Sequence, residues 1–285
     1  MMTQACHILS GKLIASRRLD AFKKRIEELR KEGVSLKLGT VRVGEAPDTL
    51  IYSKAIDSFL RKIGIGYLPR VFSEKITQEA LFKEILKLNA DPEVTGILIF
   101  SPLPRHIDAV NILSAVDLLK DVEGRRVLHG VGDRVLSPTA VAVMVLLEET
   151  GAELVGLEAV VVGRSDVVGK PCAILLMDKG VTVTVCHSRT KNLREHIQKA
   201  DVVIATVGKA NLIKGEWVKK GAIVIDVGEN MVDGKLVGDV EFEFAKEKAA
   251  FISPVPGGVG PVTNVTLIEN LMTLHKLGKV WNGNR

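Results

Sequence analysis

The stretch AVVVGRSDVVGKP, residues 159–171, is the part of this 285-residue chain that best indicates its fold. Its first three valines are typical of a buried strand, and they run into Gly163. Gly169 then precedes an apolar helical pattern over 172–179. A strand, a glycine turn and a helix direct backbone N–H groups and the positive end of a helix at a phosphate group. The dinucleotide-binding fingerprint G-x-G-x-x-G has three glycines, whereas this stretch has two, so the pattern alone is weak evidence. A tight turn that binds no ligand remains the alternative.

The pattern around this stretch predicts a doubly wound, Rossmann-like unit. A helix is expected over 139–149 and a strand over 158–162, followed by strands at 181–185, 202–206, 222–226 and 250–252. Strands that alternate with helical segments predict a parallel sheet covered by helices. Such a sheet binds its ligand at the carboxyl ends of its strands.

The residues after these strands favour NADP as the cofactor. About twenty residues after the glycine turn, NAD-binding folds usually hold an acidic residue for the ribose hydroxyls, whereas this chain has Ser188 and Arg189. Arg164 and Ser165 lie in the turn itself, and two guanidinium groups suit a 2′-phosphate. The alternative for Arg189 is a solvated loop charge. The expected cofactor-binding residues are Gly163, Arg164, Ser165, Gly169, Ser188, Arg189, Val207, Gly208 and Val227.

The first half of the chain predicts a second α/β unit. Helical patterns over 13–31, 49–63 and 78–88 alternate with strand patterns over 36–43, 67–72 and 96–100. A connection rich in glycine and charge follows over 120–137, and the final helix, 263–277, is expected to return to the first unit. We therefore expect two α/β domains with a cleft between them: a discontinuous substrate domain of residues 1–137 plus 265–285, and a Rossmann-like NADP-binding domain of residues 138–264.

Composition excludes several classes of function. Three scattered cysteines do not form a disulfide framework, and six histidines without ligand spacing predict no metal site. A net charge of +5, with few aromatic residues, gives little support for nucleic acid as a partner. No apolar run approaches the roughly 20 residues of a membrane span, and no secretory signal is visible, so a cytoplasmic protein is expected.

The segment PVPGGVGPVT, residues 254–263, is expected to form a loop that caps a flat ligand. Its glycines permit close backbone approach, and its prolines stiffen the chain. The expected substrate-loop residues are Pro256, Gly257, Gly258 and Pro261. A rigid loop between domains is the alternative interpretation.

Six motifs in the second half resemble the methylenetetrahydrofolate dehydrogenase/methenyltetrahydrofolate cyclohydrolase family. They are VVGRSDVVGKP (161–171), VTVCHSRT (183–190), ADVVIATVGK (200–209), VIDVGEN (224–230), VGDVEFE (237–243) and PVPGGVGPVT (254–263). In the first half, LNADPEVTGILI (88–99), PLPRHID (102–108) and KDVEG (120–124) are similar to the family's corresponding blocks. The resemblance covers almost the whole chain and implies a homodimer that acts on a tetrahydrofolate derivative.

This family removes a hydride from methylenetetrahydrofolate and then hydrolyses the methenyl product, and the resemblance locates the residues. The family's catalytic tyrosine is Tyr52 here, but its lysine four residues later is Ile56. The glutamine before the family's Pro-Leu-Pro turn is Phe100, and its pterin-binding aspartate is Glu123. Without the resemblance, Asp121 and Glu123 would be interpreted as a surface turn. Lys54 is about 200° round the helix from Tyr52, so we expect it to be a poor replacement for the missing lysine.

We therefore predict an NADP-dependent methylenetetrahydrofolate dehydrogenase whose cyclohydrolase activity is weak or lost. Hydride transfer needs chiefly alignment of donor and acceptor, whereas hydrolysis needs an ionisable group that activates water. Three alternatives stay open: a non-catalytic paralogue that binds folate or nucleotide, a bifunctional enzyme with a replacement base, and a dehydrogenase for another pterin-like substrate.

Overall fold

The structure, a computed structural model, describes residues 5–125 and 135–283, and it forms two compact units. Unit 1 comprises Met1–Arg18 and Ser137–Thr266, and unit 2 comprises Leu19–Leu136 and Leu267–Arg285. This division departs from the expected one at the N-terminus. Strand β1 (His7–Ile8) pairs with β11 (Phe251–Ile252), and the first residues therefore join the sheet of unit 1.

Unit 1 is built on a six-stranded sheet in which every neighbouring pair of strands is parallel. The strand order is β1-β11-β8-β7-β5-β6, so β6 and β7 lie on opposite sides of β5 and the direction of winding reverses there. The expected doubly wound α/β fold is confirmed. The central strands are β5 (Glu158–Val162), β6 (Thr182–Cys186), β7 (Val202–Ala205) and β8 (Ile223–Asp226).

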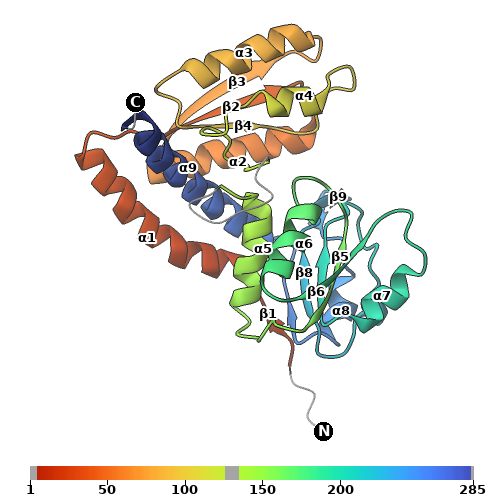
Figure 1. Cartoon of the computed structure of the whole chain (residues 1–285). Helices are drawn as coiled ribbons and strands as arrows, with labels where there is room; N and C mark the ends of the chain where they lie inside the picture. The colour runs from red at the N-terminus through yellow and green to blue at the C-terminus, as the bar shows by residue number, and fades with distance from the viewer. Residues whose placement is uncertain (1–4, 126–134, 284–285) are drawn as a thin grey trace. The chain divides into compact units, whose positions relative to one another are not determined.

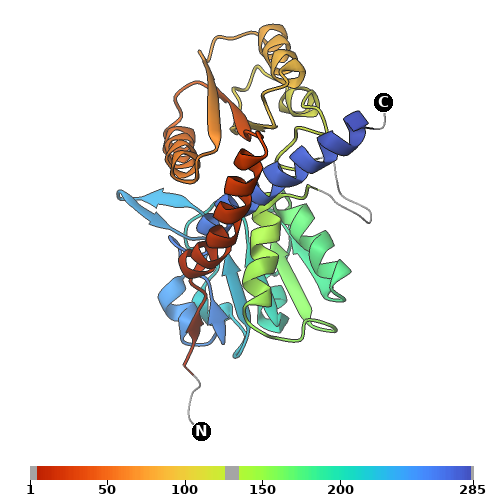
Figure 2. The same ribbon diagram turned by 90° about the vertical axis from the view of Figure 1, so that its left-hand side faces the viewer.

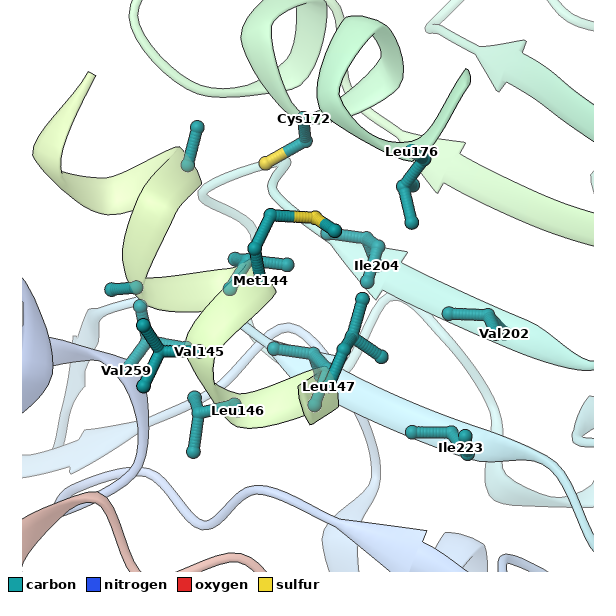
Figure 3. Packing of buried hydrophobic residues seen from close by; sticks show 14 of the residues in the cluster. Met144, Val145, Leu146, Leu147, Cys172, Leu176, Val202, Ile204, Ile223 and Val259 are labelled. Atoms are coloured by element: carbon teal, nitrogen blue, oxygen red, sulfur yellow. The ribbon is translucent and has the colours of Figure 1, made fainter. Parts of the chain in front are cut away.

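Helices cover both faces of this sheet (Figure 1). Val161 and Ile204 pack beneath the helices of one face, while Val160 and Val203 belong to the core of the other face, because successive side chains of a strand alternate. Figure 3 shows the first of these cores, where side chains of α5 and α6 meet those of β7 and β8. The helices are α5 (Pro138–Glu148) and α6 (Gly169–Asp178) on one face, and α7 (Leu193–Lys199), α8 (Phe242–Lys246) and the 3₁₀ turn η1 (Gly215–Trp217) on the other.

A two-stranded hairpin extends from unit 1 and appears in light blue in Figure 2. Its strands are β9 (Asn230–Val232) and β10 (Lys235–Val237), which pair antiparallel. The turn residues Asp233 and Gly234 have φ values of 49° and 75°. Asp-Gly is a typical sequence for a two-residue turn that needs positive φ at both positions. The hairpin was not among the elements expected from the sequence, although this dipeptide signals it.

Unit 2 has a three-stranded parallel sheet in the order β3-β2-β4. The strands are β2 (Lys37–Val43), β3 (Gly66–Phe72) and β4 (Gly96–Ile99). Helices α3 (Gln78–Ala90) and α4 (Ala109–Ser114) cover one face, and α2 (Pro47–Ile63) covers the other (Figure 1). The core beneath α2 also takes residues from α1 (Gly11–Lys31) and α9 (Val259–Gly283), which each contribute to both units.

Within the described ranges, no helix combines the length and apolar character that crossing a bilayer requires. Cys6, Cys172 and Cys186 are all free thiols. Residues 126–134, which belong to the expected connection over 120–137, lie outside the described residues.

Candidate functional site

The turn after β5 has the backbone geometry of a close-approach site. Gly163 has a φ of 130°, and a Cβ atom there would lie 2.1 Å from the carbonyl oxygen of Thr206. A Cβ atom at Gly169 would lie 2.3 Å from the carbonyl oxygen of Gly163, so the start of α6 packs directly on the turn. The two glycines of the weak fingerprint are therefore both required by contacts, at the strand where the winding of the sheet reverses.

Ser165 shapes the entry into α6. Its Oγ accepts hydrogen bonds from the backbone N–H groups of Val168 (3.2 Å) and Gly169 (3.3 Å). The hydroxyl thereby orders the turn just before the helix, and this role explains a serine in the turn without any ligand. The structure shows Ser165 as exposed, so one face of the side chain still reaches solvent.

Two arginines lie in the loops that follow two neighbouring strands of the sheet. Val162 and Cys186 are register partners at the carboxyl ends of β5 and β6, and Arg164 and Arg189 follow two and three residues later. Both arginines are exposed, and neither forms an ion pair in the described part of the chain. Ser188 is exposed beside Arg189. This edge of the sheet therefore offers uncompensated positive charge, which suits an anionic ligand.

The loop after β7 is held by a carboxylate, Asp239, that was not predicted from the sequence. Asp239 is fully buried and accepts hydrogen bonds from the backbone N–H groups of Val207 (2.6 Å), Gly208 (3.0 Å) and Lys209 (2.8 Å). Asn230 donates to the same carboxylate at 2.9 Å. Asp239 thus fixes the two expected cofactor-binding residues of this loop, because one carboxylate can accept several N–H bonds.

A second buried carboxylate supports the loop after β8. Asp226 accepts hydrogen bonds from the backbone N–H groups of Gly228 (2.9 Å), Asp239 (3.0 Å) and Val240 (2.9 Å). Burial raises the pKa of Asp226 to about 7, although these three donors oppose the shift. Val227, the expected cofactor-binding residue, is fixed through its own N–H bond to the Ala205 carbonyl (2.8 Å).

The proline- and glycine-rich loop after β11 packs against the start of α1. A Cβ atom at Gly258 would lie 2.6 Å from the carbonyl oxygen of Pro254, and one at Gly11 would lie 1.7 Å from the carbonyl oxygen of Gly258. The N–H of Lys12 donates to the carbonyl of Gly257 at 3.2 Å. Close backbone packing inside unit 1 therefore accounts for Gly258. Roles for Pro256, Gly257, Gly258 and Pro261 in substrate binding stay a prediction.

In unit 2, an aromatic pair occupies the place where the family's tyrosine and glutamine were expected. The rings of Tyr52 and Phe100 meet edge to face, with centroids 5.6 Å apart at an angle of 88°. Phe100 is 4% exposed, and Ile56, one turn after Tyr52, is fully buried in the core beneath α2. The positions that would carry a lysine and a glutamine are thus both occupied by apolar side chains of the same core.

Lys54 lies on a different stripe of α2. With Leu50, Ser53 and Asp57, at helical spacings of three and four, it lines a cavity of about 190 Å³ against the sheet. Phe100 and Arg42 also line this cavity, whereas Tyr52 does not. The expectation that Lys54 and Tyr52 point in different directions agrees with this arrangement.

Glu123 is paired inside the protein. Its Oε2 accepts hydrogen bonds from Nε (3.0 Å) and Nη2 of Arg125. The side chains of Glu123 and Arg125 are only 15% and 13% exposed. Burial raises the pKa of Glu123, and the guanidinium of Arg125 opposes that shift. Glu123 was expected at the site from the resemblance, whereas no role there was expected for Arg125.

The segment that carries Glu123 is fixed on both sides by Asn270 of α9. This buried amide donates hydrogen bonds to the carbonyls of Val122 and Leu136, each at 2.8 Å. The sequence did not single out Asn270, because its partners lie more than 130 residues away along the chain. Among the residues the structure describes, no cluster of three or more metal-ligating side chains occurs.

Comparisons with known proteins agree in both units. The catalytic-domain model of the tetrahydrofolate dehydrogenase/cyclohydrolase family matches residues 9–123, and the NAD(P)-binding-domain model of the same family matches residues 137–279. A bifunctional protein FolD 2 of Myxococcus xanthus is 46% identical over 273 residues, which make up 93% of this chain and 94% of that protein.

Solved structures show the same architecture. The bifunctional FolD methylenetetrahydrofolate dehydrogenase/cyclohydrolase of Campylobacter jejuni superposes with a TM-score of 0.91 at 37% identity, covering 95% of this chain and 99% of that one. The Trypanosoma brucei dehydrogenase-cyclohydrolase, solved with NADP and an inhibitor, gives a TM-score of 0.91 at 34% identity, covering 96% and 98%.

Proposed function

This chain belongs to the tetrahydrofolate dehydrogenase/cyclohydrolase family, and from that premise we propose that it is an NADP-dependent 5,10-methylenetetrahydrofolate dehydrogenase with weak or no cyclohydrolase activity. The observation that carries the proposal is the apolar contact beside Tyr52, where Ile56 is fully buried and Phe100 packs on the tyrosine ring.

The chain's own residues fit the phosphorylated cofactor. Gly163 and Gly169 let the turn and the start of α6 pack closely without side chains in between, and this backbone arrangement suits a pyrophosphate. Arg164 and Arg189 are free to bind a 2′-phosphate, which bidentate guanidinium donors match better than a carboxylate would. Bound NADP would supply the hydride acceptor. The buried Asp239 holds the N–H groups of Val207 and Gly208, and so keeps the loop beside the turn in place.

Hydride removal makes few chemical demands on unit 2. It moves no proton, so the protein must align the one-carbon bridge with the acceptor and tolerate a developing positive charge. Tyr52 and Glu123 can orient the pterin, Tyr52 through its ring and Glu123 through its carboxylate. Neither role requires a lysine at position 56.

Hydrolysis of the methenyl product makes heavier demands. A water must be activated and protons must move, which calls for an ionisable group within hydrogen-bond reach. At positions 56 and 100 the chain provides an isoleucine and a phenylalanine, and Lys54 lines the cavity on another stripe of α2. This absence of an ionisable side chain at both positions supports a weak or absent second activity.

The test uses purified protein with methylenetetrahydrofolate and NADP. We expect NADPH and methenyltetrahydrofolate to accumulate in equal amounts, and the methenyl compound to open only at the rate measured in buffer alone. Turnover of methenyltetrahydrofolate well above that rate would favour a bifunctional enzyme with a replacement base. Absence of NADPH would favour a non-catalytic paralogue, and cofactor binding without folate turnover would favour another pterin-like substrate.

Restoring the family residues gives the complementary test. The double substitution Ile56→Lys with Phe100→Gln should raise methenyltetrahydrofolate hydrolysis by about 100-fold or more, the usual contribution of general acid–base catalysis. The matched control is Ile56→Met with Phe100→Leu, which keeps both positions apolar. Because Ile56 is fully buried, circular dichroism must show that each variant is folded.

We further infer a cytoplasmic homodimer that associates through unit 1. The exposed apolar side chains of Met231 (51%) and Val232 (40%) on the β9–β10 hairpin support association through this unit.

A further inference from the structure

Glu123 and Arg125 form a nearly buried acid–base pair that the proposed dehydrogenase mechanism does not fully use. The two side chains are 15% and 13% exposed. Two charged groups that are so little exposed lose most of their hydration. Such a pair is stable only where the surrounding backbone holds both groups in position.

The backbone around the pair is fixed by Asp121. This carboxylate is 4% exposed, and its two oxygens accept hydrogen bonds from the N–H groups of Glu123 (3.0 Å) and Arg125 (2.9 Å). Asn270 holds the carbonyl of Val122 between them at 2.8 Å. The positions of both side chains are therefore set by the protein itself, which lowers the cost of ordering them around a ligand.

The pair keeps unused hydrogen-bonding capacity on both members. Nε and Nη2 of Arg125 both donate to the same oxygen, Oε2 of Glu123, and Nη2 also reaches the carbonyl of Ile99 at 3.4 Å. Oε1 of Glu123 and Nη1 of Arg125 bond to nothing else in the residues that the structure describes. A carboxylate oxygen only accepts and a guanidinium nitrogen only donates, so the pair presents an acceptor and a donor together.

The pair adjoins the predicted folate residues. Ile99, whose carbonyl Arg125 reaches, is followed directly by Phe100, and the ring of Phe100 packs on Tyr52. The pair and the aromatic contact are thus joined at the carboxyl end of β4.

We propose that Arg125 is a specificity-determining residue that reads the 4-oxo group of the pterin while Glu123 reads the neighbouring N–H groups. In this arrangement Nη1 of Arg125 donates to the 4-oxo oxygen, and Oε1 of Glu123 accepts from ring N3–H and the 2-amino group. The inference rests on the proposed folate function and deepens it, because it assigns a ligand atom to a residue that the resemblance leaves without a role.

The chemistry of the ligand edge matches the pair. A 2-amino-4-oxopyrimidine presents one acceptor beside two donors, and a hydrogen bond from a cation to the oxo oxygen is stronger than one between neutral groups. A 4-amino group at the same position would direct its N–H donors at the guanidinium of Arg125, which also only donates. Arg125 should therefore matter for the 4-oxo ligand and not for its 4-amino analogue.

The experiment measures binding of folic acid and of its 4-amino analogue, aminopterin, to the full chain by titration calorimetry. The change in their Kd ratio on Arg125→Met isolates the contact, whatever the absolute preference of the natural chain. We expect the ratio to shift towards the 4-amino ligand by about tenfold or more, through weaker binding of folic acid. An unchanged ratio would overturn the assignment, and so would tighter binding of folic acid.

Two further variants keep the result interpretable. Removing Arg125 leaves the carboxylate of Glu123 without its partner, which could by itself change ligand binding. The Kd ratio is therefore also compared between the single variant Glu123→Gln and the double variant Glu123→Gln with Arg125→Met. The same shift of the ratio towards the 4-amino ligand is expected. The matched control is Arg70→Met, an exposed cation on β3, which should leave the ratio unchanged. An unchanged NADP Kd shows that unit 1 is intact. Because the assay measures binding alone, its failure is distinct from a failure of dehydrogenation, and absence of folic acid binding would also overturn the inference.

Discussion

At the scale of single residues, buried carboxylates do much of the positioning in unit 1. Asp239 binds three consecutive N–H groups of the loop after β7, and Asp226 binds three N–H groups around the loop after β8. Neither carboxylate is exposed to a ligand, because they are 0% and 4% exposed. Their effect on the cofactor is therefore expected to be indirect, through the backbone that they hold.

Substitution of Asp239 tests this positioning role. In Asp239→Asn, an NH₂ group replaces one of the accepting oxygens, so at least one backbone N–H loses its partner. We expect the Kd for NADP to rise about tenfold and the free energy of unfolding to fall by about 1 to 3 kcal/mol. Titration calorimetry and urea unfolding measure the two effects. Asp233→Asn, at an exposed turn of the hairpin, is the matched control and should change neither.

Residues of this kind define the limit of prediction from sequence at this scale. Tyr52 and Glu123 could be proposed because they stand in recognisable motifs. Asp239 and Arg125 could not, because their roles depend on bonding partners: Val207 lies 32 residues from Asp239, and the carbonyl that Arg125 reaches lies 26 residues away. A motif identifies a residue type at a position, whereas these partners follow only from the folded backbone.

At the scale of elements, α2 presents two different sets of side chains on two stripes. Tyr52 and Ile56 face the aromatic contact and the core, and Leu50, Ser53, Lys54 and Asp57 line the cavity. The separation follows from the 3.6-residue period of the helix, from which the sequence predicted that Lys54 points away from Tyr52. Lys54 is exposed and lies on the other stripe from Tyr52, although Phe100 lines the same cavity as Lys54.

Paired alanine substitutions on α2 check this separation. Lys54→Ala should leave the dehydrogenase rate unchanged and alter the free energy of unfolding by less than about 0.5 kcal/mol, as exposed substitutions usually do. Ile56→Ala should lower the free energy of unfolding by about 2 to 4 kcal/mol, because the substitution opens a cavity in a fully buried site. Steady-state kinetics and urea unfolding provide both readings. A strong loss of activity in Lys54→Ala would contradict the assignment of the two stripes.

Helices and strands with a long hydrophobic pattern were predicted correctly. The tight β9–β10 hairpin and the two-residue strand β1, which pairs with a distant segment, were missed. The strand expected over 36–43 is β2 at Lys37–Val43, and the helix expected over 78–88 is α3 at Gln78–Ala90. The β9–β10 hairpin was missed although Asp233-Gly234 marks its turn. β1 has only two residues and was missed because its pairing with β11 leaves no periodic pattern to detect.

At the scale of the whole molecule, the buried Asp226 links stability to pH. Its folded pKa of about 7 lies above the ordinary 3.8, so the folded state favours the protonated form. The stabilisation from protonation is complete below the ordinary pKa. It is lost as the pH rises towards 7 and changes little above that.

The variant Asp226→Asn removes this titration. We expect the stability of the natural chain relative to the variant to fall by about 2 kcal/mol between pH 5 and pH 7, and to stay nearly constant from pH 7.5 to about pH 8.5. Urea unfolding followed by Trp217 fluorescence in a Trp281→Phe background reports on unit 1. A difference that stays constant from pH 5 to pH 7 would show that the three backbone donors outweigh burial.

The pairing of β1 with β11 has a consequence for biosynthesis. His7 leaves the ribosome long before its register partner Phe251, which follows 244 positions later. The sheet of unit 1 therefore cannot close its outer edge while the nascent chain is still short, and the open edge of β8 waits for the same late segment. This edge can be completed only after residue 251 has been synthesised, and a chain released before that point would have an exposed strand edge, which is prone to aggregate.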